Sequence, residues 1–307
     1  MSAASLAGDR QPIWFLALFA LAAGGGAVAY VPLLTVLLPL KITAMVGTED
    51  VPALARVTFF GAVFASCANI AFGMLSDRSK SRLPWIVAGL ISSSVLLVAM
   101  GGAATVAELI ILIMAWQVGL NMMLSPLLAW AGDCFPNSQK GLLGGALAFA
   151  PALGALAGSL VTFEALVDVQ FRLGIVAILV AVMVLPAVIF GRGRVQPHLM
   201  REAPERDEND PIIAEPKAAL IRMWMARFLV QISEAGLFAF LLFWLRSLSE
   251  GFHENTAANI FSAVLVVSIP LALLMGRWSD RRARPIAPLT LCAGISAAGL
   301  LIMASSN

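Results

Sequence analysis

Residues 73–82 read GMLSDRSKSR, and residues 276–285 read GRWSDRRARP. The glycine, the serine, the aspartate and the arginine after it recur at one fixed offset. Each stretch comes at the end of a long apolar run, 57–76 in the first case and 255–276 in the second. A repeat whose two copies follow equivalent apolar runs indicates two halves with the same orientation. The chain is therefore predicted to contain two parallel halves.

The composition of the chain predicts that both halves lie in a membrane. The 307 residues are 60% hydrophobic and only 12% charged, whereas soluble domains have about 45–50% apolar and about 25% charged residues. So little charge cannot cover a water-facing surface of this size. The composition argues against a soluble enzyme, a disordered chain and a nucleic-acid-binding protein with a broad basic face. We predict an all-α polytopic membrane protein that contacts the lipid bilayer.

The number of spans follows from the apolar runs, since a helix needs roughly 20 apolar residues to cross a bilayer. A ninth candidate, 223–245, is apolar apart from Arg227 and Glu234. Eight other stretches carry no charge: 11–40, 57–76, 83–107, 109–132, 141–163, 173–191, 255–276 and 285–307. We therefore expect about nine transmembrane helices.

The distribution of Lys and Arg predicts the orientation. If residue 1 is cytoplasmic, fifteen of these residues fall in cytoplasmic segments and four, Lys41, Arg56, Arg172 and Arg246, fall outside. Cytoplasmic loops carry such an excess, so the N-terminus is predicted to be cytoplasmic and the location to be the cytoplasmic membrane.

The longest polar stretch divides the chain. Residues 193–217 combine charges of both signs with four prolines, which is typical of a linker. We predict a six-helix transmembrane half at 1–192, a cytoplasmic linker at 193–217 and a partial second half with three helices at 218–307.

Both repeated loops resemble the G-x-L-x-D-R-x-x-x-R loop that the major facilitator superfamily has between helices 2 and 3 and between helices 8 and 9. The layout of six helices and a linker is similar too. Residues 76–85, together with 133–136 and 139–141, are similar to glycoside and sucrose-type cation symporters. There are two departures: the helix-4 arginine of many proton-coupled members has no counterpart in 116–119, and residues 150–155 match the antiporter helix-5 motif only in part.

The resemblance implies a fold of twelve helices, which needs roughly 400 residues at about 20 per span plus loops. The 307 residues end after the ninth predicted span. The chain is therefore expected to be truncated at its C-terminus and to lack helices 10, 11 and 12.

The resemblance also implies a gating role for the two Asp-Arg loops. A carboxylate there accepts hydrogen bonds from free N–H groups at a neighbouring helix start and pairs with nearby arginines. Such a latch holds one conformation and is released in the other. The residues assigned to it are Gly73, Asp77, Arg78, Arg82, Gly276, Asp280 and Arg281. The alternative is that the arginines only set the topology.

The predicted span 223–245 carries Arg227, Gln231 and Glu234 at spacings i, i+4 and i+7, which place them on one helix face. Glu234 falls roughly 20 Å from the cytoplasmic end, close to the midplane. A charge at that depth costs at least about 2.5–3.5 kcal/mol, so the face is expected to meet water, a partner or a cavity. We predict that Glu234 takes and releases a proton. The alternative is an interhelical pair without a role in transport.

Two further spans supply polar or flexible candidates for the substrate pathway. Gln117 and Asn121 share a helix face at i and i+4. They could form hydrogen bonds to a polar solute, or they could only form hydrogen bonds between helices. Tyr30, the only tyrosine, follows Gly24-Gly25-Gly26, which fits either a gating element or close packing. The small residues Ala150, Gly154 and Gly158 predict a packing seam.

The function predicted from these residues is secondary active transport of a small polar solute by alternating access, coupled to protons. A sugar or glycoside is the first expectation for the substrate. A drug or metabolite efflux antiporter and a non-transporting, truncated membrane protein are the alternatives. The sequence has no HExxH, CxxC or GxSxG motif, so neither an enzyme nor a metal site is expected. No cofactor is expected, and the composition argues against a nucleic-acid partner.

Overall fold

The computed structural model describes residues 10–47, 50–162, 171–191, 221–222, 225–226, 229–230, 267–268, 270–279, 281–282 and 286–305. The regular structure in these residues is helical, without strands. Seven helices among them are long and apolar enough to cross a membrane: Ile13–Val46, Pro52–Arg78, Leu83–Gly102, Val106–Cys134, Lys140–Val161, Arg172–Phe190 and Ala287–Ser305. The prediction of an all-α polytopic membrane protein is confirmed. The predicted spans 223–245 and 255–276 lie mostly outside the described residues.

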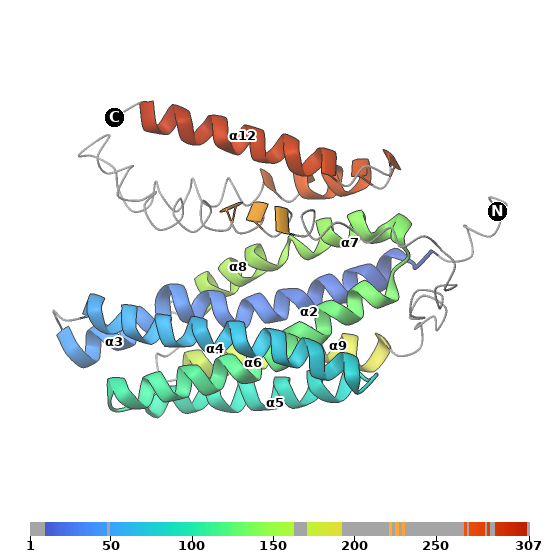
Figure 1. The fold of residues 1–307 in the computed structure, drawn as a ribbon. Coiled ribbons are helices and arrows are strands. Elements are labelled where there is room, and N and C mark those ends of the chain that lie inside the picture. The colour runs from blue at the N-terminus through green and yellow to red at the C-terminus, as the bar shows by residue number, and fades with distance from the viewer. Residues whose placement is uncertain are drawn as a thin grey trace. The chain divides into compact units, whose positions relative to one another are not determined.

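The chain divides into two compact units, Met1–Met200 and Arg201–Asn307, and each is treated by itself. The predicted domain boundaries at residues 192 and 217 lie outside the described residues. In the first unit the long helices run along one another as a bundle (Figure 1). In the second unit the longest described helix is α12, Ile286–Ser305.

The first span is one continuous helical rod made of three pieces, α2 (Ile13–Pro32), the π-helix η1 (Leu33–Leu37) and α3 (Leu38–Val46). Pro32 and Pro39 lack the N–H that the regular helix ladder needs, and the wider turn between them accommodates this loss. The Thr35 hydroxyl donates to the Val31 carbonyl over 2.6 Å. The rod ends at Gly47, whose positive φ of 62° suits a residue without a side chain.

Helices α4 (Asp50–Arg78) and α5 (Leu83–Ala99) both pack against α6 (Val106–Cys134). Gly89 and Gly119 let the backbones of α5 and α6 approach closely, because a side chain at Gly89 would collide with the backbone of Met123. Helix α6 begins with a capping box, in which the Glu108 N–H donates to the Thr105 hydroxyl over 3.2 Å.

The other face of α2 packs against α8 (Ala150–Thr162) and α9 (Arg172–Phe190). Side chains at Gly24 and Gly25 would collide with Leu153, Met183 and Val184, so close packing accounts for this glycine run. Gly154 approaches the Ala27 carbonyl in the same way, and a Cβ added at Gly158 would lie 3.8 Å from Pro32, so these two members of the predicted seam face α2. A short helix, α7 (Lys140–Leu147), precedes α8 in the same span.

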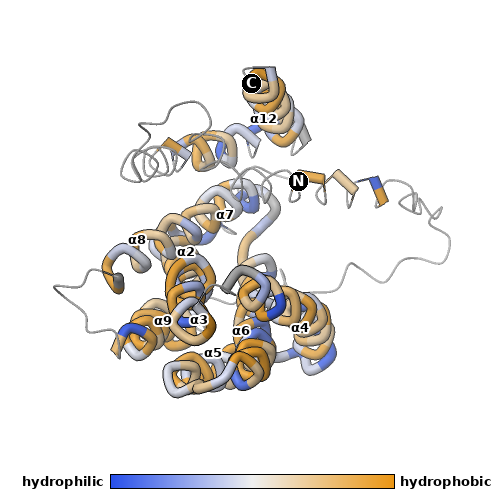
Figure 2. The backbone as a smooth tube through the Cα atoms, turned by 90° about the vertical axis from the view of Figure 1, so that its left-hand side faces the viewer, coloured by the Kyte–Doolittle hydropathy of each residue, from blue (hydrophilic) through white to orange (hydrophobic). Residues whose placement is uncertain are grey.

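Apolar side chains cover much of the outside of the first unit. Figure 2 shows that orange, hydrophobic residues predominate on the helices of the bundle, with blue, hydrophilic residues among them. The strongly exposed side chains include Ile91, Val95 and Val98 on α5 and Ile178, Val182 and Ile189 on α9. In water such a surface would associate, whereas in a bilayer it meets lipid tails.

Candidate functional site

One end of the first unit carries an ionic cluster around Arg82. Helix α4 ends at Arg78 and α5 begins at Leu83, so the first repeated loop is a short turn. Arg82 forms an ion pair with Asp77 at the end of α4. Its Nη2 also donates to Asp133 Oδ2 over 3.0 Å, and its Nε donates to the same oxygen over 3.2 Å. Asp133 belongs to the last turn of α6, so Arg82 joins three helix ends.

The three side chains of the cluster differ in exposure, and this difference shows which of the two ion pairs is the stronger. The side chain of Arg82 is 15% exposed, that of Asp133 is 33% exposed and that of Asp77 is 62% exposed. An ion pair with a solvent-exposed carboxylate contributes little, while a two-donor contact to a partly shielded one contributes more. Arg82–Asp133 is therefore the stronger of the two connections.

Ser76 extends the cluster into the bundle. Its side chain is fully buried, accepts from Arg82 Nη1 over 2.7 Å and donates to the Gly73 carbonyl over 2.9 Å. The structure thus brings together Gly73, Asp77 and Arg82 from the predicted gating set. Sequence reasoning gave Ser76 and Asp133 no role, although both lie in the motifs that it singled out.

Two other members of the first loop lie apart from the cluster. The side chain of Arg78 is exposed. Lys80 adopts a positive φ of 51°, and the turn is bridged by a hydrogen bond from Trp85 Nε1 to the Ser79 hydroxyl over 2.9 Å. The loop is therefore shaped by the backbone of Lys80 and the Trp85–Ser79 bond, while Arg82 makes its ionic contacts.

A second network at the same end ties the start of α2 to the segment after α6. The Gln11 side chain is buried, and its Nε2 donates to the Cys134 carbonyl over 3.0 Å. The Gln11 backbone N–H donates to Gln139 Oε1 over 2.8 Å, and Gln139 Nε2 donates back to the Gln11 carbonyl over 3.0 Å. Sequence reasoning did not find this reciprocal pair.

Aromatic side chains pack beneath this glutamine pair. Phe15 stacks on Phe135 with ring centroids 5.5 Å apart, and Phe19 meets Trp130 edge to face at 5.2 Å. Such pairs stabilise a contact beyond their buried area. This end of α2 is therefore held firmly against the end of α6.

Midway along the bundle, α6 presents a pair of amides. Gln117 and Asn121 flank the midpoint of this 29-residue helix and are 8% and 9% exposed. Asn121 Nδ2 donates to the Gln117 carbonyl over 2.9 Å. The Asn69 side chain on α4 donates to Asn121 Oδ1 over 3.1 Å, and the Ser125 hydroxyl donates to the Asn69 carbonyl over 2.9 Å. The amides therefore bond α4 to α6.

This amide group also retains hydrogen-bonding capacity. No hydrogen bond among the described residues uses Gln117 Nε2, and Asn69 is exposed. Gly61 on α4 faces Gln117, where an added Cβ would lie 3.8 Å from the glutamine Cγ. An amide with a spare donor in a buried, mid-helix position can bind a hydroxyl or carbonyl of a polar solute.

Several predicted residues cannot be placed in this geometry. Arg227, Gln231, Glu234 and Asp280 lie outside the described residues. Tyr30 is half-buried on α2.

In the second repeated loop, Gly276 is half-buried and Arg281 is exposed. The Arg282 guanidinium lies over the Trp278 ring, 5.9 Å from its centroid.

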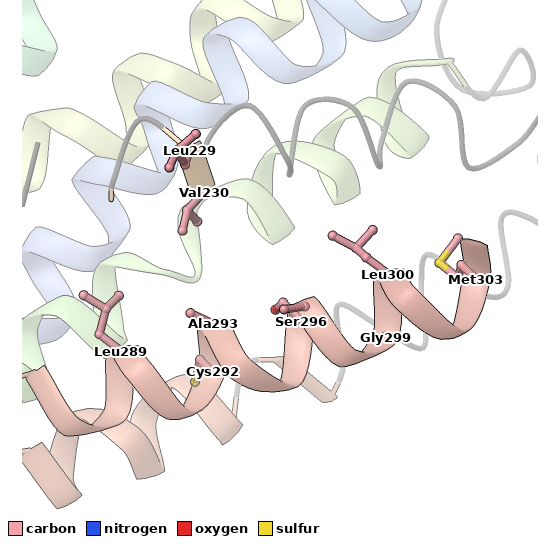
Figure 3. Close-up of a pocket in the computed structure, with 10 residues that line it drawn as sticks. Leu229, Val230, Leu289, Cys292, Ala293, Ser296, Gly299, Leu300 and Met303 are labelled. Atoms are coloured by element: carbon pink, nitrogen blue, oxygen red, sulfur yellow. The ribbon is translucent and has the colours of Figure 1, made fainter. Parts of the chain in front are cut away.

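The second unit contains a pocket of about 590 Å³ beside α12. Figure 3 shows Leu229 and Val230 on one side and α12 side chains on the other. Its described lining is apolar apart from Ser296 and Cys292. The described lining has no charged group with which to bind a charged solute, and no described His, Cys, Asp or Glu cluster could hold a metal ion.

The chain is similar to one protein family over nearly all of its length. A family model described as Major Facilitator Superfamily matches residues 13–307. No curated protein matches the chain.

Proposed function

Because the chain belongs to the Major Facilitator Superfamily and is therefore a secondary transporter embedded in a membrane, we propose that it moves a small polar solute by alternating access. The proposed organisation is a six-helix half at 1–192, a cytoplasmic linker at 193–217 and further helices at 218–307. The proposed location is the cytoplasmic membrane with a cytoplasmic N-terminus, because Lys and Arg are concentrated in the segments that would then face the cytoplasm.

The observation that carries the substrate class is the amide group on α6. Gln117 and Asn121 are buried halfway along the span, and Asn69 lies beside them on α4. Primary amides both donate and accept, as sugar hydroxyls do. A membrane span keeps such polar groups at its centre only when they are bonded or functional. These amides support a sugar or glycoside as the substrate.

Counterflow in proteoliposomes tests this substrate class. Labelled sugars should exchange, and Gln117→Leu should reduce that exchange at least tenfold by removing a donor while keeping the side-chain volume. Ser66→Ala is the matched control, because within the described part of the chain the Ser66 hydroxyl bonds only the Ala62 carbonyl of its own helix, over 2.9 Å. Unchanged exchange in the Gln117 variant would contradict the proposal.

The same assay separates the alternative of drug or metabolite efflux. That alternative rests on the partial antiporter motif at residues 150–155. Exchange of lipophilic cations in place of sugars would favour it. Absence of exchange with every solute in the panel would favour a non-transporting membrane protein.

Proton coupling through Glu234 is proposed on the sequence, because this is the one carboxylate placed deep in a predicted span, with Arg227 and Gln231 on the same face. Glu234→Gln should abolish uptake driven by a pH gradient but preserve counterflow, since counterflow requires no proton release. Intact pH-driven uptake in this variant would exclude the coupling role.

The gating latch on the cytoplasmic side is proposed to be Asp77, whose side chain is 62% exposed and can accept hydrogen bonds from a neighbouring helix start in one conformation. The Arg82 cluster is proposed to hold the end of the helix that carries Asp77 and to stay formed in both conformations. It joins the ends of α4, α5 and α6 through one guanidinium. A rigid-body movement of one helix bundle against another requires that each bundle hold its own shape. The cluster, together with Gln11 and Gln139, supports that rigidity.

A further inference from the structure

A pocket of about 530 Å³ opens at the other end of the first unit. It lies where α3 ends, where the 3-10 turn η3 (Met100–Gly102) follows α5, and where α9 begins. Figure 2 shows the ends of α3, α5 and α9 next to one another on the side facing the viewer. Its lining includes Leu40, Lys41, Val98, Gly101, Arg172 and Leu173.

Two cations line this pocket, and no carboxylate is among its described lining. Lys41 Nζ donates to the Gly101 carbonyl over 2.8 Å, which uses one of its three N–H groups. Arg172 is only 6% exposed, and its buried Nε has no hydrogen-bond partner among the described residues. A guanidinium stays protonated in proteins, so its charge cannot be relieved by losing a proton.

An unpaired buried charge is costly unless a counter-charge reaches it. The start of α9 also lacks a negative partner, because its first turn contains no acidic residue and its N-cap Phe171 makes no side-chain cap. The N-terminus of a helix carries free N–H groups and partial positive charge. Arg172, Lys41 and the start of α9 therefore direct three sources of positive potential at one pocket.

We propose that this pocket binds a phosphate group. A guanidinium and an ammonium together suit a tetrahedral oxyanion, since Arg presents paired donors and Lys a point charge. The rim of the pocket is apolar and exposed: Leu40 is 55% exposed, Val98 is 52% exposed and the neighbouring Phe171 is 61% exposed. The phosphate is carried by a lipid headgroup, whose tails would cover these side chains, or it is a free ion.

A competing partner for Arg172 exists in the sequence. Asp168 stands four positions before Arg172 and lies outside the described residues. If that carboxylate neutralised the guanidinium, the pocket would not attract phosphate. The titration below would then show no response in the wild type.

The test is a titration of the purified full chain in a neutral maltoside detergent. The probes are phosphatidylglycerol, diacylglycerol as the lipid without phosphate, inorganic phosphate, and chloride at matched ionic strength. The readout is the midpoint of thermal unfolding, because a ligand that binds only the folded state raises it with concentration. We expect a saturable rise with a phosphate-bearing probe and none with diacylglycerol or chloride.

Arg172→Gln and Lys41→Gln should each require roughly tenfold more of that probe, since each removes a charge-assisted contact. Lys41 is less buried than Arg172, so its variant keeps the test informative if Arg172→Gln folds poorly. Arg56→Gln is the matched control, because Arg56 is an exposed cation near the start of α4, at the same end, and is not among the described lining.

The outcomes separate the two sources of phosphate. A response to phosphatidylglycerol alone assigns the site to a lipid headgroup, and a comparable response to inorganic phosphate assigns it to the free ion. The proposal is overturned if neither probe exceeds diacylglycerol and chloride, or if the Arg172 and Lys41 variants titrate like the wild type.

Discussion

Two arginines at opposite ends of the first unit differ in what surrounds them. Arg82 contacts Asp77, Asp133 and Ser76 within the protein. Arg172 is more deeply buried, yet its Nε has no partner among the described residues. A guanidinium whose donors are satisfied internally stabilises the fold, whereas one left unsatisfied in a pocket stabilises the fold only once a ligand arrives. Removing each charge should therefore have opposite consequences.

The largest effect is expected from Arg82→Gln. Loss of the guanidinium leaves Asp133 partly shielded and unpaired, which should lower the free energy of unfolding by about 2 kcal/mol. Chemical denaturation of the purified protein measures this change, and transport should fall in parallel. Arg78→Gln is the control, because Arg78 lies in the same loop with its side chain exposed. Equal losses in the two variants would contradict a special role for Arg82.

Ser76→Ala should have a smaller effect in the same direction. The substitution removes the hydroxyl that accepts from Arg82 and donates to the Gly73 carbonyl, and we expect a loss of about 1 kcal/mol. A double-mutant cycle with Arg82→Gln should show coupling, since the two groups are in contact. Strict additivity would mean that the serine stabilises the turn independently of the arginine.

Arg172→Gln should change stability in the opposite sense when phosphate and anionic lipid are absent. Replacing a buried guanidinium that forms no ion pair with any described residue by a neutral amide should raise the free energy of unfolding by up to about 1 kcal/mol. The measurement is denaturation in phosphate-free buffer after delipidation. A loss as large as that of Arg82→Gln would show that Arg172 is paired within the chain and would remove the contrast between the two ends.

The smallest effect is expected from Lys80→Gly. Lys80 has a φ of 51°, a conformation that glycine adopts without strain. The relief is partly offset by the greater freedom of glycine in the unfolded chain, so we expect a gain of about 0.5 kcal/mol. Lys80→Ala, which keeps a Cβ, is the control and should not be stabilising. Comparable stability of both variants would indicate that the turn carries no strain.

The candidate site was only partly predictable from the sequence. The repeated loop identified Gly73, Asp77 and Arg82, and the structure brings them into one cluster. Asp133 appeared only as part of a short similarity, because its contact with Arg82 depends on how the end of α6 meets the loop. The hydrogen-bonded pair Gln11–Gln139 could not be predicted from the sequence, because two glutamines so far apart in the chain belong to no shared motif or helical spacing.

The role of the glycine run and the contacts of the mid-span amides also could not be predicted from the sequence alone. The run Gly24-Gly25-Gly26 left gating and packing open, and the proximity of Leu153 and Met183 shows that it serves packing. Gln117 and Asn121 were placed on one face by their spacing alone. The hydrogen bond from Asn69 to Asn121 depends on the packing of α4 against α6, which the spacing along one helix does not reveal.

The sequence by itself determined that this chain is a helical membrane protein and where its first six spans lie, because the free energy of inserting a span sums over about 20 consecutive residues. It also identified the family, through loops whose residues are close together in the chain. Only the tertiary structure decided which charges meet. Lys41 and Arg172 were two separate exceptions to the excess of Lys and Arg on the cytoplasmic side, and they line one pocket because the end of α3 lies beside the start of α9. The partner of a guanidinium depends on which helices pack and in what register, and neither is a property of any single segment.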